Sequence, residues 1–233
     1  MTNVVSLIDH AVLHPTQTSA DVRSACEMAV RLGIASVCVK PSYVALTTEL
    51  LAGSNVLPST VIGFPHGGAS RAAKVAETLR ACEQGAKEVD MVVNIGRALE
   101  GDWGYVGDDI ASVAAAAKQN GAITKVIFET GLMPSDEHKR KLCELSEAAG
   151  AAFVKTSTGF GFVKDAAGAL VSTGATVEDI TLMRATCSPA VQVKASGGIR
   201  SYEDALRMVE AGATRLGTSA TEAIAKGASG DSY

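Results

Sequence analysis

The sequence lacks the features that mark several specialised classes of protein. No two of its five cysteines have CxxC spacing, and an odd number of cysteines in a chain of 233 residues does not suggest a disulfide framework or a zinc site. No apolar run approaches the length of a membrane span, and the N-terminus has no basic stretch followed by a sustained apolar segment. We therefore expect a cytoplasmic protein with free thiols and no membrane partner.

The sequence also lacks an excess of positive charge. The formal net charge is −4, and the pI is about 5.6, so no nucleic-acid partner is expected. The four histidines have no metal-ligand spacing, so we expect no metal site.

The sequence does contain a recurring unit in which a helical pattern ends at a glycine and a short apolar run follows. Glycine can adopt the left-handed conformation that ends a helix. These glycines are Gly33, Gly85, Gly121, Gly150 and Gly212, and the runs after them are Ile34–Val39, Glu88–Val93, Thr124–Phe128, Ala151–Val154 and Thr214–Gly217. Further strands are predicted at Val4–Ile8, Ser59–Phe64 and Ala190–Val193, and helix starts at Ser135, Thr176 and Ser201.

Short apolar strands that alternate with helices predict parallel strands joined by crossover helices. Eight such units favour an α/β fold of the single-domain (β/α)8 TIM-barrel type, with an open doubly wound sheet as the alternative. We find no linker or composition break, so one domain is expected over residues 1–233. Residues from about 221 to 233 are predicted to form a C-terminal helix and a flexible tail.

Three of the predicted strands carry charged residues near their carboxyl ends, where barrel enzymes place their active sites. If the valines and the methionine of Glu88–Val93 face the helices, Asp90 and Asn94 point into the barrel. Lys155 and Lys194 end two other strands. A structural ion pair between Asp90 and one lysine is the simplest alternative, but it would leave the other lysine unpaired inside the barrel. We therefore favour catalysis.

Two adjacent lysines have a chemical rationale. A free lysine has a pKa of roughly 10.4, so only about one in 2,500 is neutral and nucleophilic at pH 7. A second ammonium nearby disfavours the protonated form and so activates the amine for Schiff-base formation. Asp90 could then transfer protons during the reaction.

Glycine-containing loops follow the last two predicted strands. Ser-Gly-Gly-Ile-Arg at 196–200 follows the strand with Lys194, and Leu-Gly-Thr-Ser-Ala at 216–220 follows the final strand. The loops after strands seven and eight of a barrel often bind phosphate through backbone N–H groups. A small phosphorylated substrate is therefore expected.

Several longer motifs resemble the deoxyribose-phosphate aldolases from the first predicted strand to the last. They include Val-Asp-Met-Val-Val-Asn-Ile-Gly at 89–96, Phe-Val-Lys-Thr-Ser-Thr-Gly-Phe at 153–160 and Val-Lys-Ala-Ser-Gly-Gly-Ile-Arg at 193–200. Shorter ones are Ile-Asp-His at 8–10, Val-Cys-Val-Lys-Pro at 37–41 and Gly-Ala-Thr-Arg-Leu-Gly-Thr-Ser at 212–219.

The resemblance implies a class I aldolase that needs no cofactor, acts in deoxyribose phosphate catabolism and forms homodimers. It would interconvert 2-deoxy-D-ribose 5-phosphate with glyceraldehyde 3-phosphate and acetaldehyde. By motif position, Lys155 is the nucleophile, Lys194 the lysine that perturbs it, and Asp90 the proton-transfer partner. The implied substrate- and phosphate-binding residues are Gly159, Gly197, Gly198, Gly217, Ser219, Asp9 and Cys38. The last residue, Tyr233, matches a terminal tyrosine that assists proton transfer in some members.

Four features depart from that family's usual pattern. His14 and Lys40 replace other residues at positions expected on the rim of the site, and Ala220 replaces a serine. The segment 161–173 is longer than usual and is expected to be a surface loop on the active-site face.

Three alternatives stay open. The first is a Schiff-base aldolase that uses a different aldehyde acceptor. The second is a phosphosugar isomerase or epimerase on the same barrel, in which Lys155 would be dispensable. The third is a non-catalytic binding barrel, which leaves two buried lysines unexplained.

Overall fold

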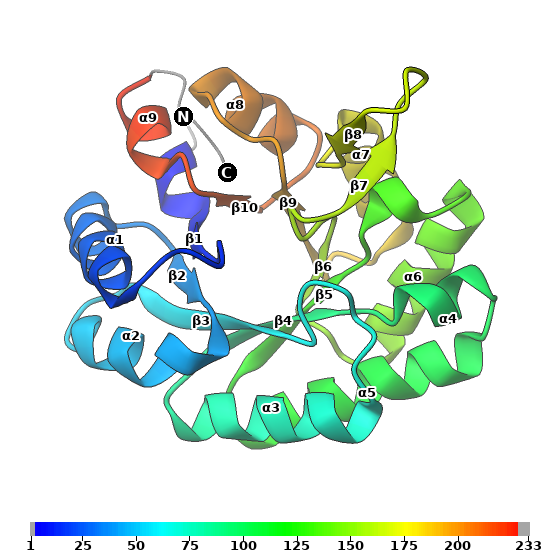
Figure 1. Ribbon diagram of the computed structural model, residues 1–233, viewed down its shortest axis with the longest axis horizontal. Coiled ribbons are helices and arrows are strands. Elements are labelled where there is room, and N and C mark those ends of the chain that lie inside the picture. Colours follow the sequence, from blue (N-terminus) through cyan, green and yellow to red (C-terminus); the bar gives the residue numbers. More distant parts are fainter. Residues whose placement is uncertain (1–2, 228–233) are drawn as a thin grey trace.

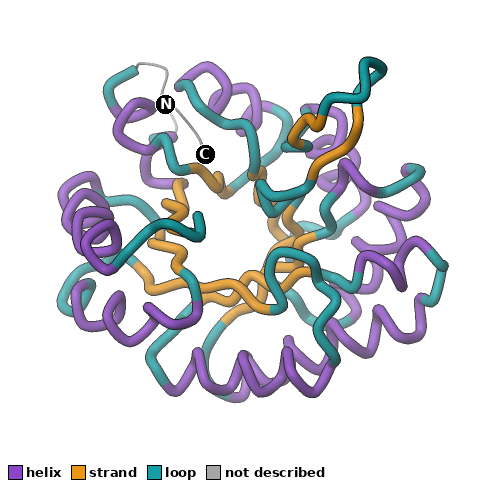
Figure 2. The backbone as a smooth tube through the Cα atoms, in the orientation of Figure 1, coloured by secondary structure: helices purple, strands orange, loops and turns teal. Residues whose placement is uncertain are grey.

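The computed structural model describes residues 3–227, which form a closed barrel of eight parallel strands surrounded by helices (Figure 1). The strand order around the barrel is β1-β10-β9-β6-β5-β4-β3-β2. In the tube view the strands form one inner ring and the helices lie outside it (Figure 2). The (β/α)8 prediction is therefore confirmed, and the open doubly wound sheet is wrong.

The barrel strands are β1 (Ile8–Val12), β2 (Ser36–Val39), β3 (Leu57–Ile62), β4 (Glu88–Val92), β5 (Ile123–Ile127), β6 (Phe153–Lys155), β9 (Gln192–Ser196) and β10 (Arg215–Thr218). The helices are α1 (Ser19–Leu32), α2 (Val44–Leu50), α3 (Arg71–Glu83), α4 (Ile95–Leu99), α5 (Trp103–Gln119), α6 (Asp136–Ala148), α7 (Val177–Thr186), α8 (Tyr202–Glu210) and α9 (Thr221–Ala225). Short 3-10 turns occur at Val4–Leu7, Pro41–Tyr43 and Thr130–Leu132.

The helix boundaries follow the predicted local chemistry. All five glycines predicted to end helices have positive φ, as a left-handed residue at a helix C-terminus requires. The hydroxyl of Thr176 accepts a hydrogen bond from the Asp179 N–H at the start of α7. Ser201 and Asp204 form a capping box at the start of α8. These N-caps orient the two helices that follow the active-site loops.

The prediction for the first strand is wrong. Val4–Leu7 is a 3-10 turn, and β1 begins only at Ile8. The turn is closed by hydrogen bonds from the Ser6 N–H and hydroxyl to the Asn3 carbonyl, while the Val4 side chain is buried. A run of five residues is too short for hydrophobicity alone to distinguish a strand from a helical turn.

The predicted direction of Asn94 is also wrong. Asn94 follows the end of β4 and is the N-cap of α4, where its side-chain oxygen accepts a hydrogen bond from the Arg97 N–H. The strand alternation therefore stops before Asn94, and a helix cap uses its side chain instead. Asp90, within β4, does point into the barrel.

The long segment after β6 forms a small hairpin. Strands β7 (Phe162–Lys164) and β8 (Leu170–Ser172) pair antiparallel and extend from the rim at the upper right of Figure 1. Phe162 and Leu170 are exposed. The predicted surface loop is therefore an ordered pair of strands at the mouth of the barrel.

Two findings bear on the composition arguments. Within residues 3–227, no helix is long and apolar enough to cross a membrane. None of the five cysteines forms a disulfide bond in the structure.

Candidate active site

A cavity of about 370 Å³ opens at the carboxyl ends of the barrel strands. Lys155 and Lys194 both line it. So does every residue assigned to the substrate or its phosphate by the resemblance: Asp9, Cys38, Gly159, Gly197, Gly198, Gly217 and Ser219. The fold therefore brings together residues from five different strands and from the loops after them.

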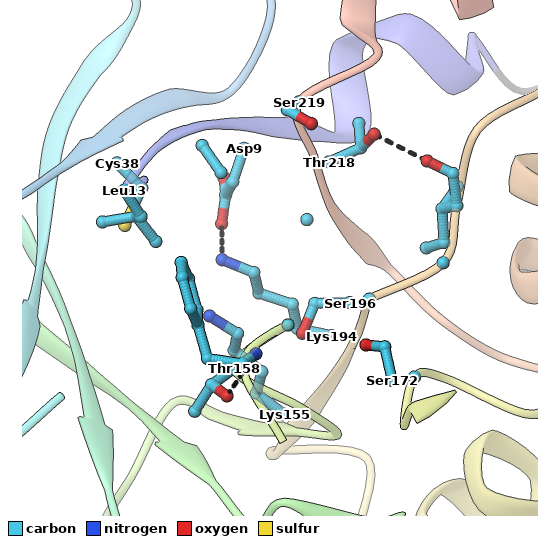
Figure 3. Close-up of a pocket in the computed structure, with 18 of the residues that line it drawn as sticks. Asp9, Leu13, Cys38, Lys155, Thr158, Ser172, Lys194, Ser196, Thr218 and Ser219 are labelled. Carbon is cyan, nitrogen blue, oxygen red and sulfur yellow. Dashed lines mark hydrogen bonds and ion pairs between the residues drawn. The ribbon is translucent and has the colours of Figure 1, made fainter. Parts of the chain in front are cut away.

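Lys155 and Lys194 occupy paired positions on the neighbouring strands β6 and β9. Their Nζ atoms lie 2.9 Å and 2.8 Å from the same oxygen, Oδ2 of Asp90 on β4. Figure 3 shows both lysines converging on the cavity, with Lys194 also reaching Asp9. Asp90 itself is fully buried below them and is not among the residues that line the cavity.

The premise that an ion pair with Asp90 would leave one lysine unpaired is wrong. Both lysines share Asp90, and Lys194 has a second carboxylate, Asp9, at 2.5 Å. The register of β6 and β9 sets both side-chain nitrogens at the same height in the barrel, so that one carboxylate can contact both.

More charged residues lie below this pair than the sequence analysis identified. Lys125 on β5 is completely buried and contacts Asp9, Glu88 and Asp90 at 2.9, 2.5 and 2.9 Å. Arg215 on β10 contacts Asp9 at 2.6 Å and Glu88 at 3.0 Å. Both oxygens of Asp9 are thereby engaged, so Asp9 belongs to an ion network as well as to the cavity wall.

The two catalytic candidates have opposite electrostatic surroundings. Burial lowers the pKa of Lys155 below its ordinary value; Asp90 opposes this effect and Lys194 adds to it. Burial alone would also lower the pKa of Lys194, but Asp9 and Asp90 together raise it above its ordinary value. These surroundings shift Lys155 towards the neutral amine and Lys194 towards the ammonium form.

Asp90 is held as a carboxylate. Burial acts to raise the pKa of Asp90, but Lys125, Lys155 and Lys194 outweigh it and hold that pKa well below the usual range. The thiol of Cys38 is different, because burial raises its pKa and keeps it neutral.

The glycines of the cavity wall allow close approach of the backbone. Gly159, Gly197 and Gly198 have positive φ, which L-residues with side chains rarely adopt. A Cβ at Gly217 would lie 2.8 Å from the Cβ of Ser196 and 3.1 Å from the Cε of Lys194. The hydroxyl of Thr218, the last residue of β10, donates to the Ile199 carbonyl and so ties the end of β10 to the loop after β9. The end of β10 and this loop therefore form one wall.

Glu129, which follows β5 and precedes the 3-10 turn Thr130–Leu132, was not identified from the sequence. It has φ of 55°, an uncommon conformation for a residue other than glycine, and it is only 1% exposed. Its carboxylate accepts hydrogen bonds from the N–H and the hydroxyl of Thr158, which lines the cavity. At Gly161 a Cβ would lie 2.7 Å from the Glu129 carboxyl carbon. Glu129 thus holds the segment that follows Lys155 and leads into the hairpin.

The rim residues are placed more specifically than the sequence indicated. Lys40 does not simply extend into solvent, because its Nζ donates to the carbonyls of His14, Pro15 and Gln17 at 2.8–3.2 Å. His14 and Arg200 line the cavity.

Tyr233 lies outside the described residues. Across residues 3–227, no group of three or more His, Cys, Asp or Glu side chains is arranged to hold a metal ion.

One signal could have identified Lys125 earlier. It is the second residue of the predicted strand Thr124–Phe128, and a charge on a buried strand was the criterion that singled out Lys155 and Lys194. Glu88 and Arg215 begin their strands, where a charge is less informative. Glu129 follows its strand and shows no comparable signal.

The comparisons with known proteins address the identity of the whole chain. Residues 3–230 match the DeoC/LacD family aldolase. This chain belongs to that family. Deoxyribose-phosphate aldolase of Bacillus mycoides is 50% identical over 235 residues, covering 99% of this chain and 100% of the relative. The enzyme of the same name from Carboxydothermus hydrogenoformans is 47% identical and covers 100% and 98%.

The DeoC/LacD assignment also holds for the three-dimensional structure. Deoxyribose phosphate aldolase from Aeropyrum pernix, described as tetrameric, superposes with a TM-score of 0.85 at 32% identity. The match covers 96% of this chain and 89% of that one. The chain is therefore an aldolase of this family, a carbon–carbon lyase.

Proposed function

We propose that this chain is a class I aldolase that reversibly cleaves 2-deoxy-D-ribose 5-phosphate to glyceraldehyde 3-phosphate and acetaldehyde, through a Schiff base on Lys155. The observation that carries the proposal is the position of Lys155. Its amine lines the cavity, and its pKa is lowered by burial and by Lys194 against the opposing effect of Asp90. The names of the two bacterial relatives supply the substrate.

The chemistry begins with the open-chain aldehyde of the substrate. The neutral amine of Lys155 attacks C1, and loss of water from the carbinolamine gives an iminium ion. Removal of the C3 hydroxyl proton then breaks the C2–C3 bond, and the bonding electrons move into an enamine. Glyceraldehyde 3-phosphate leaves, the enamine is protonated at C2, and hydrolysis of the iminium releases acetaldehyde and free Lys155.

Asp90 and Lys194 have distinct roles in this scheme. Asp90 Oδ2 lies 2.9 Å from the reacting Nζ of Lys155, so it can accept or return the protons that the amine loses and gains. Lys194 keeps its proton and favours the neutral form of Lys155. Since Lys194 also lines the cavity, it can act as a donor to substrate oxygens.

The phosphate is assigned to the wall made by Gly159, Gly197, Gly198, Gly217 and Ser219. Backbone N–H groups on glycine-rich loops bind anions well, and the positive φ angles of this wall are compatible with such concave loops. Arg200, which lines the same cavity, adds positive charge. The cavity therefore combines a wall suited to an anionic group with a reactive lysine.

The test is covalent trapping. The protein is incubated with 2-deoxyribose 5-phosphate, reduced with borohydride and mapped by peptide mass spectrometry. A two-carbon adduct on Lys155, absent in Lys155→Ala with unchanged circular dichroism, is the expected result. Retained cleavage in Lys155→Ala would contradict the mechanism. An adduct formed only with other aldehydes would show a different substrate.

Two further properties stay predictions from the sequence: a homodimeric assembly and a cytoplasmic location. Light scattering after size-exclusion chromatography measures the first, with a mass of twice 23.8 kDa expected. A tetramer, as described for the Aeropyrum pernix protein, would contradict it.

A further inference from the structure

Beneath the catalytic lysines lies a layer of charged residues that does not line the cavity. It consists of Lys125 from the middle of β5 and of Glu88 and Arg215, which begin β4 and β10. Lys125 and Glu88 are no more than 1% exposed. This lower layer is joined to the cavity through Asp9 and Asp90, which contact both levels.

The two levels form one buried charge cluster with an odd number of ionisable groups. Its bases are Lys125, Lys155, Lys194 and Arg215, and its carboxylates are Asp9, Glu88 and Asp90. If every group were ionised, the cluster would carry one excess positive charge. Buried charge without a partner is costly, so one base is expected to be neutral.

The contacts decide which base that is. Arginine stays protonated in proteins. Lys125 contacts three carboxylates and Lys194 contacts two, whereas Lys155 contacts only Asp90. Lys155 therefore gives up its proton at the lowest cost.

We infer that Lys125, Glu88 and Arg215 are positioning residues for the aldolase reaction: by balancing the charge of Asp9 and Asp90 from below, they leave Lys155 as the one neutral amine of the cluster. The raised pKa of Lys125 and the lowered pKa of Lys155 agree with this distribution of protons. The inference rests on the proposed function, in which Lys155 reacts as a neutral amine.

Several other groups also face Lys155 or line the same cavity. Asp90 (β4), Lys194 (β9) and Cys38 (β2) affect it most directly. Glu129, after β5, interacts with Lys155 electrostatically, but burial raises the pKa of its carboxyl and its hydrogen bonds go to Thr158. His14 and Arg200 line the same cavity. None of these groups is altered in the variants below.

The first variant is Lys125→Met, which keeps the length of the side chain and removes its charge. Asp9, Glu88 and Asp90 each retain another cationic partner, so the fold should persist. The three carboxylates then face two permanent cations, and Lys155, the strongest remaining base, takes up the missing proton. Because the reaction needs neutral Lys155, kcat/KM rises with pH through the pKa of this lysine, and this rise is the acid limb of the profile. In Lys125→Met the acid limb is expected to move to higher pH by about one to two units. Borohydride trapping on Lys155 should fall at neutral pH and recover at higher pH.

The decisive variant is the double substitution Lys125→Met/Glu88→Gln. It removes one cation and one carboxylate, so the cluster is again balanced with Lys155 neutral. The acid limb should return to within about half a unit of the wild-type position. Glu88→Gln alone should move the limb downward by about one unit. If Lys125→Met does not fold, the single Glu88→Gln variant decides the question.

Lys74→Met is the matched control. Lys74 is a second fully buried lysine in an ion pair, with Asp109, but it lies between α3 and α5 outside the barrel. The Lys74→Met variant is assayed at a temperature where circular dichroism shows that it is folded. Its acid limb should lie at the same pH as that of the wild type.

An acid limb that stays in place in Lys125→Met, or in Glu88→Gln when the former does not fold, would overturn the inference. So would a limb that the double variant fails to restore. A purely structural role for Lys125 would lower activity equally at every pH. Failure of the proposed function is distinguishable, because wild-type protein would then form no adduct on Lys155 at any pH.

Discussion

Removal of the Lys194 charge should change the pH dependence of the reaction more than any other single substitution in the cavity. Lys155 and Lys194 both contact Asp90 Oδ2, at 2.9 Å and 2.8 Å, so their nitrogens cannot be farther apart than these two distances added together. Two unit charges about 5 Å apart, at an effective dielectric constant of about 20, repel each other by about 3 kcal/mol. This energy corresponds to about two pKa units.

The sign follows from the reacting species. Cleavage requires neutral Lys155, so activity rises as pH increases through the pKa of this lysine. Lys194→Met removes the repulsion that favours the neutral amine and also leaves Asp90 with one fewer cation. The pKa of Lys155 therefore rises, and the acid limb of kcat/KM moves to higher pH by about two units. Below that limb the neutral fraction of Lys155 falls about 100-fold.

The assay is a pH profile of deoxyribose 5-phosphate cleavage for wild type, Lys194→Met and Lys194→Arg. The arginine variant retains a positive charge, so its acid limb should stay close to that of the wild type. An equal loss of activity at every pH in Lys194→Met, with no displacement of the limb, would refute the electrostatic reasoning. Lys194 would then act only through contacts with the substrate.

Three further predictions concern other parts of the molecule. Glu129→Ala removes the acceptor for both Thr158 hydrogen bonds, so the loop after Lys155 loosens. In steady-state kinetics, KM for the phosphorylated substrate should rise several-fold, and Glu129→Gln should recover most of the loss. Lys74→Met leaves the Asp109 carboxylate buried without its cation. The free energy of unfolding measured in urea should therefore fall by about 3–5 kcal/mol, and Lys74→Met/Asp109→Leu should restore much of this stability. Tyr233→Phe tests the role implied by the resemblance: the rate of proton exchange at C2 of acetaldehyde, followed by NMR in D₂O, should fall while borohydride trapping on Lys155 persists.

Local sequence patterns predicted the elements whose chemistry is local. Each helix-ending glycine has positive φ, and the caps at Thr176 and Ser201 form their expected hydrogen bonds. Lys155 and Lys194 could be selected because a charge on a strand buried on both faces needs a reason. Where local chemistry was ambiguous, the prediction failed: Val4–Leu7 is a turn instead of a strand, and Asn94 caps a helix instead of facing the barrel.

The sequence by itself determined the alternation of strands and helices, the closed barrel that this alternation favours, and the two lysines at its mouth. Only the tertiary structure decided how the charges are paired. Lys194 and Asp9 are 185 residues apart in the chain, yet they lie 2.5 Å apart because closure of the barrel brings β1 close to β9 across β10. Strand register and closure set which carboxylates each base contacts, and those contacts decide which lysine can lose its proton. Because such long-range distances depend on the whole barrel, no local pattern in the sequence specifies them.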